Sequence, residues 1–114
     1  MKKANHSILK IHASSTDKLG SKLLYRHIVE LAREKGITGA TVYRGIMGYG
    51  SSSRITSTRF WELTEKLPIV IELVDKTEKL EEFYSVIEDD LVRMPKGCLV
   101  VMEPASIMLQ KKGK

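Results

Sequence analysis

The sequence predicts an α+β domain in which one antiparallel sheet carries two helices on one of its faces. Four apolar stretches have strand-like spacing, two segments have helical spacing, and their order along the chain is strand, helix, strand, strand, helix, strand. With 114 residues, 42% of them apolar, the chain has the size and composition of one globular domain. We therefore expect residues 1–114 to form a single domain with short basic tails.

The first strand is expected at residues 7–13. Leu9 and Ile11 alternate there with Lys10 and His12, which is the period-two pattern of a half-buried strand. One face of this strand should therefore contact the core, and the other should not.

The first helix is expected between residues 17 and 36. Leu24, Ile28 and Leu31 recur at helical spacing, and a hydroxyl or carboxylate side chain at 15–17 can cap the start. The glycine at the end of this stretch is a typical helix stop.

Two more strands are expected on either side of a segment rich in glycine and serine. Residues 40–47 carry the β-branched and aromatic side chains typical of a strand, and residues 48–53 should interrupt regular structure. Residues 68–74 predict a third strand that is apolar along most of its length, with an extended arm through residues 60–63 before it.

The second helix and the fourth strand complete the pattern. Asp75 and Glu78 have the spacing of a reciprocal helix cap, and apolar residues follow at steps of three and four until the helix frays near Pro95. Residues 98–102 predict the last strand, and Pro104 marks either its end or an edge position.

This order of elements predicts the ferredoxin-like arrangement, because two right-handed helical crossovers onto one sheet place both helices on the same face. The third and fourth strands are nearly continuous apolar runs rather than clean alternations. Soluble monomers seldom leave such a surface bare. We therefore expect the second face of the sheet to contact another subunit.

Charge and composition argue against nucleic acid as a partner. The formal net charge is +5, but five lysines lie in the two tails, and the remaining basic residues equal the 14 acidic ones. The expected central strands contain no aromatic residue on which RNA bases could stack.

The same composition predicts a cytoplasmic protein. The longest apolar runs are far too short to span a bilayer, and no apolar stretch of signal-peptide length follows the basic start of the chain. Cys98 is the single cysteine, so no internal disulfide is expected.

No catalytic or metal-binding set is expected. His6 and His12 lie about 20 Å apart if they share one strand, and His27 is on the flank of a helix. No base adjacent to Cys98 can be identified. The paired carboxylates of the second helix are sequence neighbours, which point apart on a helix.

Residues 36–60 have the composition of an anion-binding segment. They hold five of the eight glycines, three consecutive serines and three arginines (Arg44, Arg54 and Arg59), without one carboxylate. Glycines allow backbone N–H groups to approach an anion, and arginines supply charge-assisted hydrogen bonds. Neither a P-loop nor a Rossmann motif is present. The alternative is a hairpin with solvated arginines.

Two stretches, residues 36–50 (containing GITGATVYRG and GYG) and residues 67–75 (LPIVIELVD), resemble domain of unknown function 190, also called uncharacterised protein family 0166. The resemblance extends from about residue 9 to residue 108. That family is similar to the PII-type nitrogen-signalling proteins, which are trimers of ferredoxin-like subunits with a loop after the second strand and small ligands, often adenine nucleotides, in clefts between subunits.

The resemblance implies a PII-like homotrimer in which residues 45–59 correspond to the signalling loop and residues 93–97 to the loop that faces the ligand. Together with the composition it suggests these ligand contacts: Arg44, Gly45, Gly48, Gly50, Arg54, Arg59, Arg93, Lys96 and Gly97.

The sequence thus predicts a regulator that senses a small anion, with an adenine nucleotide as one candidate, and that acts on a protein target. The segment from Gly48 to Arg59 is expected to be mobile in the free protein and to become ordered by its arginine contacts. Two alternatives stay open, namely a small phosphatase-like enzyme of the same strand order and a structural trimer without ligand.

Overall fold

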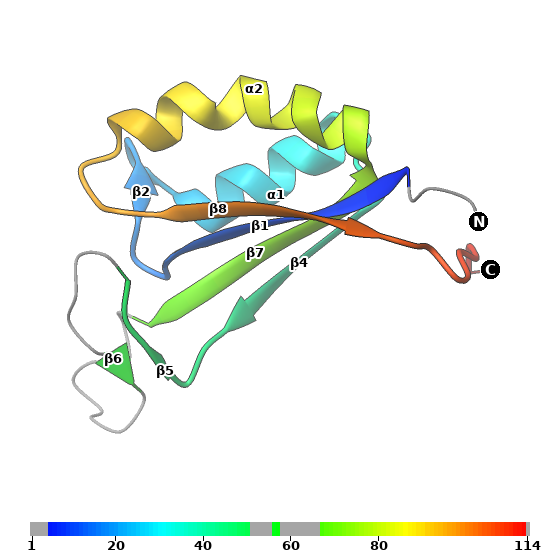
Figure 1. Cartoon of the computed structure of the whole chain (residues 1–114). Coiled ribbons are helices and arrows are strands. Elements are labelled where there is room, and N and C mark those ends of the chain that lie inside the picture. Colours follow the sequence, from blue (N-terminus) through cyan, green and yellow to red (C-terminus); the bar gives the residue numbers. More distant parts are fainter. Residues whose placement is uncertain (1–4, 51–55, 58–66, 114) are drawn as a thin grey trace.

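The computed structural model describes residues 5–50, 56–57 and 67–113, and it contains the four main strands and both helices expected from the sequence (Figure 1). The elements in chain order are β1 (His6–Ser14), β2 (Lys18–Leu19), β3 (Lys22–Leu23), α1 (Leu24–Glu34), β4 (Gly39–Arg44), β5 (Met47–Gly48), β6 (Thr56–Ser57), β7 (Pro68–Lys76), α2 (Thr77–Arg93) and β8 (Leu99–Ala105).

The main sheet has the strand order β4-β7-β1-β8, and every neighbouring pair is antiparallel. The central strand β1 pairs with β7 from His6 opposite Lys76 to Ser14 opposite Pro68. Both helices lie on the same face of this sheet (Figure 1). The fold is therefore the ferredoxin-like α+β sandwich that the sequence predicts.

The core lies between the helices and the inner face of the sheet. Its sheet side is built by alternate residues of the two central strands, because side chains alternate between the faces of a strand. The core residues are Leu9, Ile11, Leu24, Ile28, Ala32, Ile69, Ile71, Leu73, Leu80, Phe83, Ile87, Leu91 and Met94.

Neither helix among the described residues is long and apolar enough to cross a bilayer.

The first helix starts later than the sequence predicts. It begins at Leu24, and its first residue is preceded by the short hairpin β2–β3. Asp17 does not cap the helix with its side chain. Its carboxylate instead accepts a hydrogen bond from the N–H of Ser14 (2.9 Å), and its carbonyl accepts one from the N–H of Leu24 (2.8 Å). The expected stop is confirmed, because Gly36 has a φ of +78° directly after the helix.

The strand expected at residues 40–47 is shorter, and it ends at Arg44. The N–H of Gly45 still donates to the carbonyl of Pro68 (2.7 Å), after which the chain leaves the main sheet. The expected break at residues 48–53 is wrong at its first residue, since Gly48 belongs to β5 and pairs with Thr56 of β6. The break is confirmed at Tyr49 and Gly50, which belong to no strand or helix, whereas residues 51–53 and the arm expected at 60–63 lie outside the described residues.

The reciprocal cap expected at Asp75 and Glu78 is also wrong. Helix α2 begins at Thr77, and its N-cap residue Lys76 makes no capping hydrogen bond with its side chain. Asp75 is the penultimate residue of β7 and is used elsewhere, as described below. The end of the helix agrees with the prediction, because α2 stops at Arg93.

The last strand extends further than expected, from Leu99 to Ala105, and includes Pro104. Of the two expectations for this proline, the edge position is confirmed. In the described part of the chain β8 pairs with β1 alone, and an edge strand tolerates a residue that lacks an N–H donor.

Candidate functional site

Three segments lie at the same end of the sheet: the β2–β3 hairpin, the connection between α2 and β8, and the start of the β5–β6 ribbon (Figure 1). Strand β4 ends at this edge of the molecule with Arg44, whose side chain is exposed. The candidate ligand contacts in the described part of the chain all belong to this end.

The backbone at Gly45 and Gly48 packs closely around Pro68. A Cβ atom at Gly45 would lie 3.0 Å from Cγ of Pro68 and 3.3 Å from its carbonyl oxygen, and one at Gly48 would lie 3.4 Å from the same Cγ. The N–H of Gly45 already donates a hydrogen bond to the carbonyl of Pro68, so it is used within the fold and not offered to a ligand. Gly50 is exposed, and a Cβ there would have no atom of the other described residues within 4 Å.

The second group of candidates lies where α2 ends. The N–H of Met94 donates to the carbonyl of Asp90 (3.1 Å), and the buried Met94 side chain holds this end of the helix against the core. Arg93, Lys96 and Gly97 are all exposed around it. The connection therefore offers two cationic side chains from a fixed backbone.

Within one protomer, Arg44 and the glycines after it lie apart from Arg93 and Lys96. Arg44 ends one edge strand of the sheet, whereas the connection that carries Arg93 and Lys96 leads into the other edge strand. Three strand spacings separate β4 from β8, which is about 14 Å. Arg54 and Arg59 lie outside the described residues, so their place relative to either group stays a prediction.

Beside Arg93 lies a hollow of about 350 Å³, which the sequence did not predict. Its other wall is formed by strand β2 (Lys18 and Leu19) and by Gly20 of the turn that follows it. A signal for this hairpin is present, because Gly20 and Ser21 stand between two Lys-Leu pairs as a two-residue turn, and Gly20 has a φ of +64°.

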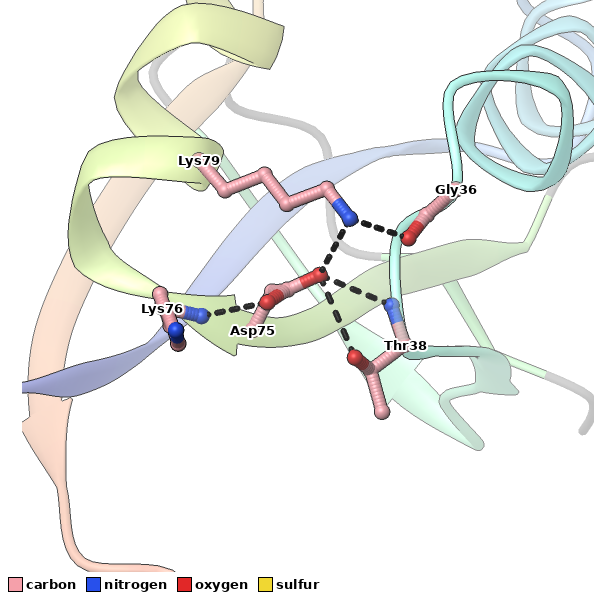
Figure 2. A network of polar contacts seen from close by, with 5 residues as sticks. All are labelled: Gly36, Thr38, Asp75, Lys76 and Lys79. Carbon is pink, nitrogen blue, oxygen red and sulfur yellow. Dashed lines mark hydrogen bonds and ion pairs between the residues drawn. The ribbon is translucent and has the colours of Figure 1, made fainter.

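At the opposite end of the sheet, Asp75 joins three parts of the fold (Figure 2). Its carboxylate accepts hydrogen bonds from the N–H and hydroxyl of Thr38 (2.9 and 3.2 Å) and from the N–H of Lys76 (2.6 Å). Lys79 lies 3.5 Å from the same carboxylate and donates to the carbonyl of Gly36. Burial by itself would raise the pKa of Asp75, but these N–H groups and the Lys79 ammonium outweigh it and lower that pKa. The cluster therefore connects β7, the start of α2 and the segment after α1.

The face of the sheet opposite the helices is partly apolar and largely uncovered. Leu99 is 58% exposed and Val101 is 37% exposed, and Val70 and Val74 on β7 are half-buried. The register places these residues on the same face, because Leu99 lies opposite His12, which lies opposite Val70.

One ion pair lies on that open face. Lys10 Nζ is 2.8 Å from Oε1 of Glu103 on the neighbouring strand, and Glu72 faces Lys10 from the other side. The hydrogen bond from Lys10 to Glu103, together with the charge of that carboxylate, raises the pKa of the Lys10 ammonium. Lys10 and Glu103 on this face are therefore already partnered within the protomer.

The fold is that of the PII-like proteins. The chain has the fold of a PII-like signalling protein from Thermus thermophilus, with a TM-score of 0.62 and 17% identity over 92% of this chain and 91% of that one. It is also similar to CPII, a nitrogen regulatory PII-like protein from Thiomonas intermedia K12 (TM-score 0.58, 14% identity, 90% and 89% covered). A third similar structure is the divalent ion tolerance protein CutA1 from Ehrlichia chaffeensis (TM-score 0.56, 15% identity, 93% and 86% covered).

The sequence then assigns the family. The chain belongs to DUF190, a family of uncharacterized ACR proteins, whose model matches residues 6–107. It is 34% identical over 88 residues to a UPF0166 protein of Aquifex aeolicus (strain VF5), which covers 77% of this chain and 84% of that protein. It is 39% identical over 87 residues to a UPF0166 protein of Methanocaldococcus jannaschii, with 73% and 80% covered. The family resemblance that the sequence suggested is confirmed.

Proposed function

We propose that this protein is a cytoplasmic PII-like regulator and not an enzyme. Three subunits close into a ring, a small anion binds in the clefts between them, and the segment from residue 45 to residue 59 transmits the bound state to a protein target. The trimeric stoichiometry is inferred from the similarity of the family to PII-type proteins, and the uncovered face of the sheet supports assembly.

The observation that carries this proposal is the open face of the sheet. Burying the exposed surface of Leu99 and Val101 together with the half-buried valines of β7 would be favourable, because removing apolar surface from water contributes about 25 cal/mol per Å². Assembly would also remove water from the ion pair of Lys10 and Glu103, which costs part of this gain, although each charge keeps its partner within the same protomer.

Assembly also accounts for the separation of the candidate cations. Arg44 lies at one edge of the sheet, and Arg93 and Lys96 lie beside the other edge at the same end. A ring in which the β4 edge of one subunit approaches the β8 edge of the next would bring them to a shared cleft. Arginine and lysine side chains from two subunits then suit a phosphate or carboxylate group.

An adenine nucleotide is a reasonable first candidate for that anion. The structure of CPII from Thiomonas intermedia K12 holds ADP, AMP and bicarbonate. The same fold therefore accommodates ligands of this kind in that protein, and the cations of this chain supply charge for their phosphates.

Assembly is tested by sedimentation or light scattering at micromolar concentration. We expect a trimer for the parent protein and a monomer for Val101→Arg, because that change places a charge in the buried face. Val92→Arg is the matched control, since Val92 is 76% exposed on α2, on the other side of the sheet. A parent protein that is monomeric would contradict the proposal, and so would a Val101→Arg variant that assembles normally.

Ligand binding is tested by calorimetry with ATP, ADP, AMP and a cyclic nucleotide, run beside a generic phosphatase assay. Saturable binding without turnover is the expected result. Turnover would instead support a small phosphatase-like enzyme of the same strand order. Neither binding nor turnover, in a protein that does assemble, would support a structural trimer.

A further inference from the structure

We propose that the hollow between the β2–β3 hairpin and the end of α2 binds a free acidic amino acid. This site lies within one protomer, so it goes beyond the cleft proposed above and does not depend on the assembly of subunits.

The walls of the hollow come from two segments that are far apart in the sequence. The hairpin supplies Lys18, Leu19 and Gly20, and the end of α2 with the following turn supplies Asp90, Arg93, Met94 and Pro95. Figure 1 shows the hairpin standing beside this end of the helix. The volume of about 350 Å³ falls within the roughly 300–1,000 Å³ typical of small-molecule sites.

The backbone around the hollow is held in place on both sides. Gly20 has a φ of +64°, which the tight hairpin turn requires, and Met94 is only 7% exposed beneath the opposite wall. The backbone on both sides of the hollow therefore belongs to the folded structure, and exposed side chains complete its walls.

Three charged side chains line the hollow. Lys18, Asp90 and Arg93 form no ion pair with any residue in the described ranges. Lys18 and Arg93 provide positive charge for an anionic group. Asp90 provides negative charge, and the carbonyl groups at the C-terminal end of α2 add to it.

This combination selects for a ligand with both kinds of charge. Two cations and one carboxylate leave one excess positive charge, and glutamate or aspartate has the complementary set, with two carboxylates and one ammonium. A dicarboxylate without an amine would leave Asp90 unpaired, and a neutral amino acid would leave one cation unpaired. Leu19 and Met94 offer apolar contact for the methylene groups of the side chain.

Calorimetric or NMR titration of the full-length protein with L-glutamate tests the site, with glutarate and L-glutamine as comparison ligands. We expect glutamate to bind about tenfold more tightly than either analogue, because each analogue loses one hydrogen-bonded charge pair. Asp90→Asn should weaken glutamate binding about tenfold and leave glutarate binding no weaker. Lys18→Ala should weaken the binding of both ligands.

The control is Lys112→Ala, which removes the same charge as Lys18→Ala from an exposed position in the C-terminal tail and should leave binding unchanged. Lys18 and Asp90 are exposed, so their variants should unfold at the same denaturant concentration as the parent. Equal binding of glutamate and glutarate would overturn the proposal, as would the absence of saturable binding or full binding by Lys18→Ala.

The outcome is independent of the proposed function. A monomer that binds glutamate would contradict only the trimer, and a trimer that binds a nucleotide but no glutamate would contradict only this site. Lys18 and Asp90 make the distinction, because Arg93 is a candidate contact of both sites.

Discussion

Replacing Asp75 by alanine removes the carboxylate that joins β7, the start of α2 and the turn after α1 (Figure 2). The Asp75 residue is 5% exposed, so few water molecules can replace its partners. A hydrogen bond to a charged group contributes about 1.5–3 kcal/mol. We count only the two bonds from Thr38, because the Lys76 donor is an adjacent residue and the Lys79 side chain is 41% exposed. At the lower limit for each bond, the free energy of unfolding falls by about 3 kcal/mol.

Urea denaturation followed by circular dichroism measures this change. The protomer concentration is kept constant, because assembly would contribute to the apparent stability. For a chain of this length, about 3 kcal/mol corresponds to a melting temperature about 12 °C lower. Glu81→Gln is the control, since Glu81 is an exposed carboxylate on α2, the helix that follows Asp75, and its effect should stay below about 0.5 kcal/mol.

The same comparison has a defined pH dependence. The folded-state pKa of Asp75 is lowered, so its contribution to stability is fully present above the unfolded pKa of about 4 and is lost as the pH falls through the folded value. The difference between the parent and Asp75→Ala should therefore be constant from about pH 5 to pH 8 and should shrink below about pH 4. A difference of less than about 0.5 kcal/mol at pH 7 would refute the reasoning that this carboxylate holds the three segments together.

Three further predictions concern the candidate site and the single thiol. Gly45→Ala should lower the free energy of unfolding, measured in a urea titration, by about 1–3 kcal/mol, because its Cβ would lie 3.0 Å from Cγ of Pro68. Gly50→Ala should change it by less than about 0.5 kcal/mol, and equal effects of the two variants would show that the close packing is unimportant. Arg54→Ala or Arg59→Ala should weaken binding of the anion by about 1.5–3 kcal/mol in calorimetry, with little change in melting temperature. If the melting temperature falls without an effect on binding, these arginines instead pack or pair between subunits. Burial, with a smaller effect of the Asp17 carboxylate, raises the pKa of the Cys98 thiol, so its alkylation near pH 8 should be slower than that of free cysteine and should accelerate at higher pH. An alkylation rate equal to that of free cysteine would contradict this prediction.

The strands and helices could be predicted from the sequence because the pattern that defines each one is contained within it. Leu9 and Ile11 alternate with Lys10 and His12, and that alternation depends only on which face of β1 contacts the core. The glycine stop of α1 and the end of α2 are likewise local signals, and both were predicted correctly. The order of these elements was enough to indicate the ferredoxin-like fold.

Positions whose partners are distant in the sequence were predicted poorly. Asp75 has the local spacing of a helix cap, yet its carboxylate binds Thr38, which lies 37 positions earlier in the chain and becomes a neighbour only after β4 pairs with β7. The start of α1 was misplaced for a different reason, because the hairpin before it is local and its turn signal at Gly20 and Ser21 was not used. The spacing of Leu24, Ile28 and Leu31 does not show whether the preceding residues continue the helix or fold back as a hairpin.

For the candidate site, too, the residue types could be predicted from the sequence, but their relative positions could not. The glycines and cations of residues 36–60 and 93–97 could be recognised by residue type, since anion recognition requires those groups. Their placement depends on the strand order, which puts Arg44 and Arg93 on opposite edges of one sheet and brings Lys18 beside the end of α2. Strand order results from long-range pairing and packing of the whole core, and no single segment of the sequence encodes it.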